Sequence, residues 1–290
     1  MGRRLLACAA SGVTGAFVAA AANQRATGAQ HGSHWMRTNF AGKNVTLAEG
    51  PIAVVALLAG IGVDRLLDPS GHRGLPVVVA SVGSALVGAY DDRHGSSQAK
   101  GLRGHLRALR SGQLTSGMIK VFGVGVSAAA AAALVQRSRP CCPRPACRVI
   151  GGLLDTALIA ATANLINLLD LRPGRAAKVI ILLGSGLLGS GAAPAVGAAV
   201  GSLPTDLAER SMLGDCGANA LGAALGTAAA QALPWQLRLL GFAAVAALNL
   251  ASEQVSFTAV IERTPLLRRL DQLGRAVPAS SRTDDVRERR

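Results

Sequence analysis

The chain has 290 residues, of which 50% are hydrophobic and only 16% are charged. Soluble domains carry about a quarter of charged residues, so the composition argues against a soluble globular protein. Lys and Arg number 30 against 16 Asp and Glu, which gives a net charge of +14. In a soluble protein this excess would indicate nucleic-acid binding. Here the basic residues lie mainly in loops beside apolar runs, so we expect contact with anionic lipid and phosphate, and no nucleic-acid partner.

Apolar runs recur along the chain, and crossing a bilayer takes about 20 such residues. They predict an all-α polytopic transmembrane helix bundle with about nine spans. The candidate spans are residues 5–22, 51–67, 75–90, 117–135, 149–169, 176–190, 191–203, 216–233 and 236–251. Residues 176–203 also allow one long bent span in place of two short ones. We expect one membrane-embedded, transferase-like domain over residues 1–275 and a charged, disordered tail over residues 276–290.

The first apolar run, residues 5–22, allows two interpretations. Arg3 and Arg4 precede it and three Ala end it, as in a cleaved signal peptide. We favour an uncleaved first helix, because further spans follow it in the same chain.

The distribution of basic residues predicts the orientation in the membrane. With nine spans, alternate loops and the C-terminal segment share one side and hold 19 Lys and Arg, whereas the other side holds eight. The first side therefore faces the cytoplasm, and we expect a multi-pass protein of the inner (plasma) membrane. Two details disagree with this count. Arg3 and Arg4 precede the first span, and the basic segment 136–148 falls on the other side.

Polar side chains gather at the predicted cytoplasmic ends of three spans. They are the pair Asp91 and Asp92, the series Asn164, Asn167 and Asp170, and Asp215. Residues three apart share a face of a helix, so the two Asn and the following Asp can face one pocket. Acids that converge from separate helix ends suit Mg²⁺, which takes one or two carboxylates and leaves its other positions to water and substrate phosphates. The alternatives are interhelical hydrogen bonds for the Asn side chains and a solvated helix end for the Asp pair.

A basic segment, residues 101–110, follows the third span. Its Leu residues fall at helical spacing and its Arg residues form a second stripe, which predicts a short interfacial helix with a cationic face near lipid headgroups. The candidates for contact with a substrate phosphate or a lipid headgroup are Lys100, Arg103, His105 and Arg107. Simple anchoring at the membrane surface would produce the same pattern.

Residues 184–189, GSGLLG, match the dinucleotide fingerprint G-x-G-x-x-G. The segment 179–183 before them is strand-like, and Asp206 follows at a plausible distance. However, no alternation of strands and helices surrounds the motif, and Gly-rich runs are common in membrane helices. We therefore reject a dinucleotide site.

Taken in order, these motifs are similar to those of the polyprenyl-phosphate N-acetylhexosamine-1-phosphate transferase superfamily, which includes phospho-N-acetylmuramoyl-pentapeptide transferase. The similarity rests on Asp91-Asp92, on the Asn164, Asn167 and Asp170 series, and on Gly214-Asp215-x-Gly217. It covers about residues 37–275 and resembles a divergent bacterial branch. The family moves a sugar-1-phosphate from a UDP-sugar to polyprenyl phosphate, releases UMP and uses Mg²⁺. The resemblance thus implies a membrane glycosyltransferase of cell wall biogenesis, and it allows a homodimer.

The resemblance also implies roles for the matching residues. Asp215 and Asp170 are expected to bind the metal. Asp91 and Asp92 are expected to be catalytic, by organising the metal or by orienting the acceptor phosphate. The nucleotide is expected to contact Asn164, Asn167 and Asp170.

The chain departs from the family's pattern at three places. Gly95 stands where the third acid of D-D-x-x-D belongs, Leu171 and the residues after it replace the D-G-x-D-G-L continuation, and segment 263–275 occupies the place of a histidine-rich loop. Two alternatives therefore stay open: a non-catalytic member that binds nucleotide or lipid as an envelope scaffold, and a transporter. A transporter predicts polar groups in both membrane halves. Here the acids and Asn residues gather at one side, apart from Asp155, which lies inside a span, and pairing with a neighbouring helix would explain it.

Overall fold

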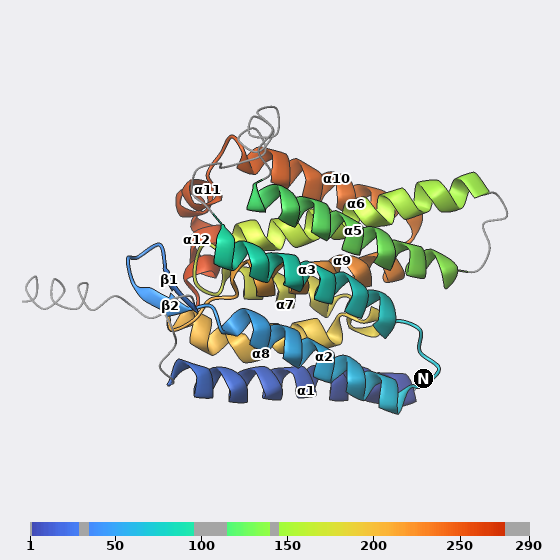
Figure 1. The fold of residues 1–290 in the computed structure, drawn as a ribbon, viewed down its shortest axis with the longest axis horizontal. Helices are drawn as coiled ribbons and strands as arrows, with labels where there is room; N and C mark the ends of the chain where they lie inside the picture. Colours follow the sequence, from blue (N-terminus) through green and yellow to red (C-terminus); the bar gives the residue numbers. More distant parts are fainter. Residues whose placement is uncertain (1, 29–34, 96–114, 140–144, 276–290) are drawn as a thin grey trace, which may run out of the picture.

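The computed structural model describes residues 2–28, 35–95, 115–139 and 145–275, which form a helical bundle with one small sheet (Figure 1). Nine helices of this part run in alternating directions between two ends of the bundle. They are α1 (Gly2–Thr27), α2 (Glu49–Leu67), α3 (Gly74–His94), α5 (Ser116–Arg137), α6 (Pro145–Leu169), α7 (Arg175–Ser185), α8 (Ala193–Leu207), α9 (Gly214–Ala232) and α10 (Trp235–Ser252). Two short helices, α11 (Phe257–Arg263) and α12 (Pro265–Gln272), end the described chain.

The two ends of the bundle differ in what they carry. The sheet end, at the left of Figure 1, holds strands β1 (Met36–Thr38) and β2 (Asn44–Thr46) together with α11 and α12. The far end holds the start of α1 and the turn between α2 and α3 (residues 68–73). The loops predicted to share one side of the membrane, where they are described, all lie at the sheet end.

Five described helices, α1, α2, α3, α5 and α6, are long and apolar enough to cross a membrane. A sixth span results if α10 and α11, which are bent by 100° at the break between them, count as one. The predicted all-α bundle is therefore confirmed for the described residues, whereas nine spans are not. Residues 176–203 form two helices, α7 and α8, of 11 and 15 residues, which is short for a span.

The structure around the break between α7 and α8 also agrees with the rejection of a dinucleotide site. Residues 179–183 belong to α7, and a 3₁₀ turn, η2 (Leu188–Ser190), follows. Gly191 then adopts φ +95°, which side chains other than glycine rarely tolerate. The segment before the Gly-rich run is helical, so the β-strand that a dinucleotide fold requires is replaced by a helix.

Small residues let α9 pass through the middle of the bundle. α9 is buried along almost its whole length, against α3 on one side and α6 on another. A Cβ atom added at Gly88 of α3 would overlap the backbone of Asp215. Without a side chain at that position, the two backbones meet directly. This contact sets the C-terminal end of α3 beside the first turn of α9.

The strands form a hairpin that is fastened over the start of α9. Arg37 pairs with Val45 in the antiparallel register, and the carboxamide oxygen of Asn39 accepts the N–H groups of Ala41 and Lys43 in the turn. Thr46 then exchanges backbone hydrogen bonds with residues 210 and 212, just before α9. The hairpin therefore brings Arg37 to the sheet end.

Asp155 of α6 is fully buried near the far end, and its carboxylate meets two guanidinium groups. Arg238 of α10 lies at 2.5 Å and Arg139, just after α5, at 3.1 Å. The Gln136 amide also donates to it, at 2.6 Å. Pairing with neighbouring helices thus accounts for this acid, as expected for a carboxylate inside a span.

Two predicted features lie outside the described residues. They are the interfacial helix over 101–110, with its phosphate-binding candidates Lys100, Arg103, His105 and Arg107, and the disordered tail over 276–290. Both stay predictions.

Candidate active site

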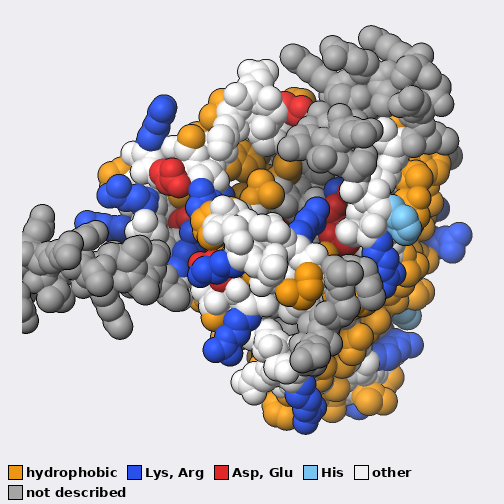
Figure 2. Space-filling model, turned by 60° about the vertical axis from the view of Figure 1, so that its left-hand side comes forward, with side chains coloured by type: hydrophobic (Ala, Val, Ile, Leu, Met, Phe, Trp, Pro, Cys, Tyr) orange, Lys and Arg blue, Asp and Glu red, His pale blue; other side chains and the backbone are white. Residues whose placement is uncertain are grey.

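Four predicted acidic residues come together at the sheet end: Asp91, Asp92, Asp170 and Asp215. They come from the end of α3, the residue after α6 and the first turn of α9. Figure 2 shows this end, where Lys and Arg side chains surround a recess in which acidic side chains are visible. The predicted convergence of three helix ends is therefore present in the structure.

The start of α9 explains how these acids are held. The first N–H groups of a helix have no partner inside it, and no side chain of α9 caps them. Asp170 Oδ2 accepts the N–H of Gly214 at 2.8 Å. Asp92 accepts the N–H groups of Asp215 at 3.0 Å and of Cys216 at 2.9 Å. Carboxylates are favoured at the positive end of a helix dipole, so α3 and α6 together fix the position of α9.

Asp92 is a positioning residue in this geometry. Its two carboxylate oxygens are committed to the α9 N–H groups, and Arg37 contacts one of them at 3.3 Å. Its predicted catalytic role stays a prediction. Asp91 and Asp215, in contrast, both contact the same cation through their carboxylates. Gly214, between the capped groups, has φ +60°, and an added Cβ would meet the Asp92 carboxylate at 3.0 Å.

A lysine joins the two remaining acids. Lys120 Nζ of α5 lies 3.0 Å from Asp91 Oδ2 and 2.7 Å from Asp215 Oδ2. All three side chains are mostly buried. Burial raises the pKa of Asp215 to about 6, although Lys120 acts in the opposite direction. The Asp215 carboxyl can therefore change charge near neutral pH.

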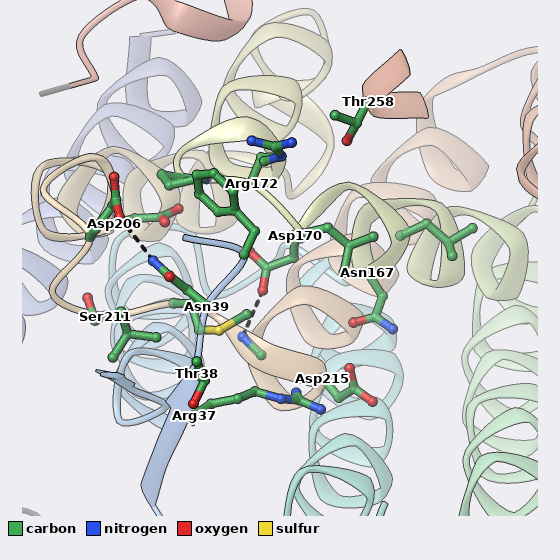
Figure 3. A pocket seen from close by; sticks show the side chains of 18 of the residues that line it. Arg37, Thr38, Asn39, Asn167, Asp170, Arg172, Asp206, Ser211, Asp215 and Thr258 are labelled. Carbon is green, nitrogen blue, oxygen red and sulfur yellow. Dashed lines mark hydrogen bonds between the residues drawn. The ribbon is translucent and has the colours of Figure 1, made fainter. Parts of the chain in front are cut away.

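Beside these groups lies a cavity of about 680 Å³. Asp215 and Asp170 line it together with Arg37, Asn167 and Arg172 (Figure 3). In this view the Arg37 guanidinium and the Asn167 amide both extend toward Asp215. The cavity thus presents carboxylates, cations and an amide to a single ligand.

Arg172 lines the same cavity and stacks on an aromatic ring. Its guanidinium lies 4.0 Å from the centre of the Phe40 ring in the hairpin turn, which is a favourable cation–π distance. Glu262 of α11 approaches Arg172 at 3.4 Å. An ordered cation therefore lines the cavity, two residues after Asp170.

Asn164 is not part of the cavity, in contrast to the expectation that both Asn face one pocket. Its amide donates to Asn249 Oδ1 of α10 at 2.6 Å, and Asn249 in turn donates to the backbone of Ala161. The three-residue spacing places both Asn on one helical face. Asn164 lies almost one turn earlier on α6, however, where it contacts a neighbouring helix, so the interhelical alternative applies. Its predicted contact with the nucleotide has no geometric support here.

The acids could supply part of the ligand shell of a magnesium ion but not all of it. No group of three or more His, Cys, Asp or Glu within the described ranges is arranged to hold a metal, and Asp170 already uses one oxygen on Gly214. Asp215 and Asp91 keep carboxylate oxygens that face Lys120 rather than α9. Mg²⁺ commonly takes one or two carboxylates and completes its shell with water and phosphate, so this donor set fits an ion shared with a substrate. It does not fit a metal that is enclosed by protein ligands alone.

Two further buried acids belong to this region: Asp206 lines the cavity, and Glu49 contacts Ser211, which also lines it. Glu49, at the start of α2, is fully buried, and its carboxylate accepts a hydrogen bond from the hydroxyl of Ser211. Burial raises the pKa of Asp206 to about 7, against the opposing effects of the Gly174 N–H and of Arg275 and Lys178. Burial also raises the pKa of Asp170, and repulsion from the carboxylates of Asp206 and Glu49 raises it further.

The raised pKa of Asp206 predicts how stability depends on pH. The ordinary pKa is 3.8, so between about pH 4 and pH 7 the folded protein holds a proton that the unfolded chain has released. The free energy of unfolding should therefore fall as pH rises through this window and level off above it. In detergent, we expect the melting temperature to drop by several degrees, roughly, between pH 5 and pH 8, and Asp206→Asn should reduce that drop.

Glu262→Gln, at an exposed position of α11, serves as the matched control and should keep the wild-type pH dependence. An equally steep loss of stability in Asp206→Asn would contradict the assignment of this titration to Asp206.

Sequence reasoning missed three residues of the site: Lys120, Arg37 and Asp206. Lys120 carries a signal that could have found it, since it is a charge inside an otherwise apolar span, and such charges are usually functional. Arg37 and Asp206 lie in polar segments without a periodic pattern. Only the hairpin and the end of α8 bring them to the cavity.

Comparison with known proteins does not decide the family. No family model matches this sequence, and no curated protein matches it.

Proposed function

We propose that this protein is a membrane glycosyl-1-phosphate transferase. It moves a sugar-1-phosphate from a UDP-sugar to polyprenyl phosphate and releases UMP. The observation that supports this best is the meeting of Asp91, Asp170 and Asp215, from three helices, beside a cavity that also holds Arg37 and Arg172. The order of the motifs along the chain supports the same reaction.

The reaction matches the charges of the cavity. An oxygen of the acceptor phosphate attacks the β-phosphorus of the UDP-sugar, and the bond from that phosphorus to the bridging oxygen breaks. UMP leaves with the electron pair. Phosphoryl transfer requires positioning and charge neutralisation more than covalent help from the protein. Arg37 and Arg172 are placed to bind the diphosphate, and Lys120 to neutralise the acids or a phosphate as the ligand enters.

Magnesium is the expected cofactor, held by Asp215 and Asp91 and by phosphate oxygens of the substrate. When bound, it would neutralise the charge of the transferred phosphate. Asp92 and Asp170 would act on this centre through α9, because their hydrogen bonds hold its first turn in place.

The lipid acceptor agrees with a site at one end of apolar helices. A polyprenyl phosphate would keep its tail beside the candidate spans and its phosphate at the level of the sheet end. We place that end on the cytoplasmic side of the inner membrane, since most basic residues lie in its loops.

One observation favours the non-catalytic alternative. Lys120 lies between Asp91 and Asp215 and forms an ion pair with each of them. A scaffold that binds nucleotide or lipid would need nothing more. The two functions differ in turnover, so a direct assay separates them.

The test is Mg²⁺-dependent release of UMP by the purified full-length protein in detergent. Polyprenyl phosphate is mixed with each of a panel of UDP-sugars, with a chelator in a parallel series. We expect release with one sugar or a few, and loss of release when the chelator removes the metal. If well-folded protein releases no UMP with any sugar, the transferase proposal is wrong and nucleotide binding becomes the measurement that tests the scaffold.

A further inference from the structure

Two adjoining pockets at the far end of the bundle share Arg4 and Arg73. The first has a volume of about 420 Å³ and is lined by these two residues, Arg139 and His72. The second has a volume of about 640 Å³ and adds Arg3 and the single acid Asp68. We call the two together the far-end basin. The first pocket has no Asp or Glu among the residues of the described chain that line it.

The far-end basin gathers the arginines that disagreed with the predicted orientation. Arg3 and Arg4 come from the start of α1, and Arg139 comes from the basic segment after α5. They are far apart in the sequence, and Arg73 joins them from the turn before α3. A ligand of negative charge that contacts all of them would explain why these basic residues lie together at this end.

The backbone orders two of these guanidinium groups. Arg73 donates to the carbonyl of Gly189, and Arg139 donates to the carbonyl of Ala230 while pairing with Asp155. A guanidinium has five N–H donors, so these contacts leave donors over in both residues. The Arg4 side chain is 67% exposed, and its acid contact is Asp68 at 3.8 Å. The backbone therefore holds Arg73 in place, Arg4 has a long acid contact, and Arg139 shares the Asp155 carboxylate with Arg238, so the cluster keeps an excess of positive charge.

We propose that the far-end basin binds a phosphate group. Planar guanidinium groups bind phosphate oxygens through paired, charge-assisted hydrogen bonds. Gln231 lines the same pocket, and its amide, which donates one N–H to the Arg73 carbonyl, keeps a second N–H as a neutral donor. The hydroxyls of Ser70 and Ser138 also line it but donate to Asp68 and to the Leu134 carbonyl. The basin lies where the candidate spans α1 and α3 begin and α2 and α5 end, so it would lie at the level of the lipid headgroups when these helices cross the membrane. The phosphate comes either from an anionic phospholipid or from free phosphate.

This site is separate from the candidate active site at the sheet end. It shares no residue with that site, so the two proposals succeed or fail independently.

The test measures phosphate binding by the full-length protein in detergent. Native mass spectrometry follows binding of dioctanoyl phosphatidylglycerol, with dioctanoylglycerol, which lacks the phosphate, as the comparison ligand. Thermal melts with and without inorganic phosphate form the second arm. Arg4→Gln and Arg73→Gln should each weaken binding about ten-fold, as expected for the loss of a charge-assisted contact. Arg25→Gln, at the other end of α1 and also exposed, is the matched control and should bind like the wild type.

The two arms separate the sources. Binding of phosphatidylglycerol alone supports a lipid headgroup, whereas stabilisation by inorganic phosphate without lipid supports a soluble ligand. Arg4 is exposed, so Arg4→Gln should fold even if Arg73→Gln does not. Equal binding by Arg4→Gln and Arg25→Gln, or equal binding of the lipid that lacks phosphate, would overturn the proposal.

Discussion

Asp215→Asn is expected to lower UMP release about a thousand-fold. The change keeps the shape of the side chain but removes the negative charge that would hold the metal. A metal at a transferred phosphate contributes several kcal/mol, and each 1.4 kcal/mol or so is a factor of ten in rate. The variant should fold, because Asp91 still pairs with Lys120 and the backbone of Asp215 is still held by Asp92. Initial rates are compared at saturating Mg²⁺ and UDP-sugar.

Asp64→Asn is the matched control for this experiment. Asp64 lies on α2 near the far end, where it lines a separate pocket with Arg65 and Gly74. The same chemical change there should leave the rate within about two-fold of the wild type. A rate for Asp215→Asn close to that of the control would remove Asp215 from the chemistry and, with it, the proposed metal position.

Asp155→Asn is expected to destabilise the protein by about 3–5 kcal/mol. Asp155 is fully buried between Arg238, at 2.5 Å, and Arg139, at 3.1 Å. Removing one member of a buried ion cluster leaves the other charges without compensation, and this costs far more than an exposed pair contributes. Here two guanidinium groups would face each other across an amide. Unfolding in mixed micelles of mild and denaturing detergent measures the difference in free energy.

A second substitution distinguishes lost charge balance from lost packing. Arg139→Gln added to Asp155→Asn removes one unpaired charge, so the double variant should recover part of the stability. If Asp155→Asn lies within about 0.5 kcal/mol of the wild type, the buried cluster does not stabilise the bundle and Asp155 needs another explanation.

The sequence predicted the positions of the helices more reliably than the number of helices that cross the membrane. Runs such as 117–135 and 149–169 correspond to α5 and α6, because continuous apolar segments must form helices when the backbone has no water to bond with. Residues 176–203 were ambiguous, since Gly-rich stretches suit both a bend and a break. The structure has a break there, and α7 and α8 remain short.

The candidate site was predicted in part. Asp91, Asp170 and Asp215 were expected together because each lies at the end of a helix on the same side. Asn164 and Asn167 share a helical face, but only Asn167 reaches the cavity. Periodicity in the sequence predicts which face of the helix a side chain lies on. It does not predict which neighbouring helix that side chain contacts at a given position along the helix axis.

By itself, therefore, the sequence determined the all-α class and the gathering of Asp91, Asp170 and Asp215 at one end of the bundle. These follow from hydrophobicity and spacing along one chain, which are local properties. The tertiary structure alone decided that Lys120 joins Asp91 to Asp215 and that Arg4, Arg73 and Arg139 meet at the far end. Such meetings depend on which helices pack together and how closely, and glycine positions such as Gly88 set that distance only when both partners are in place.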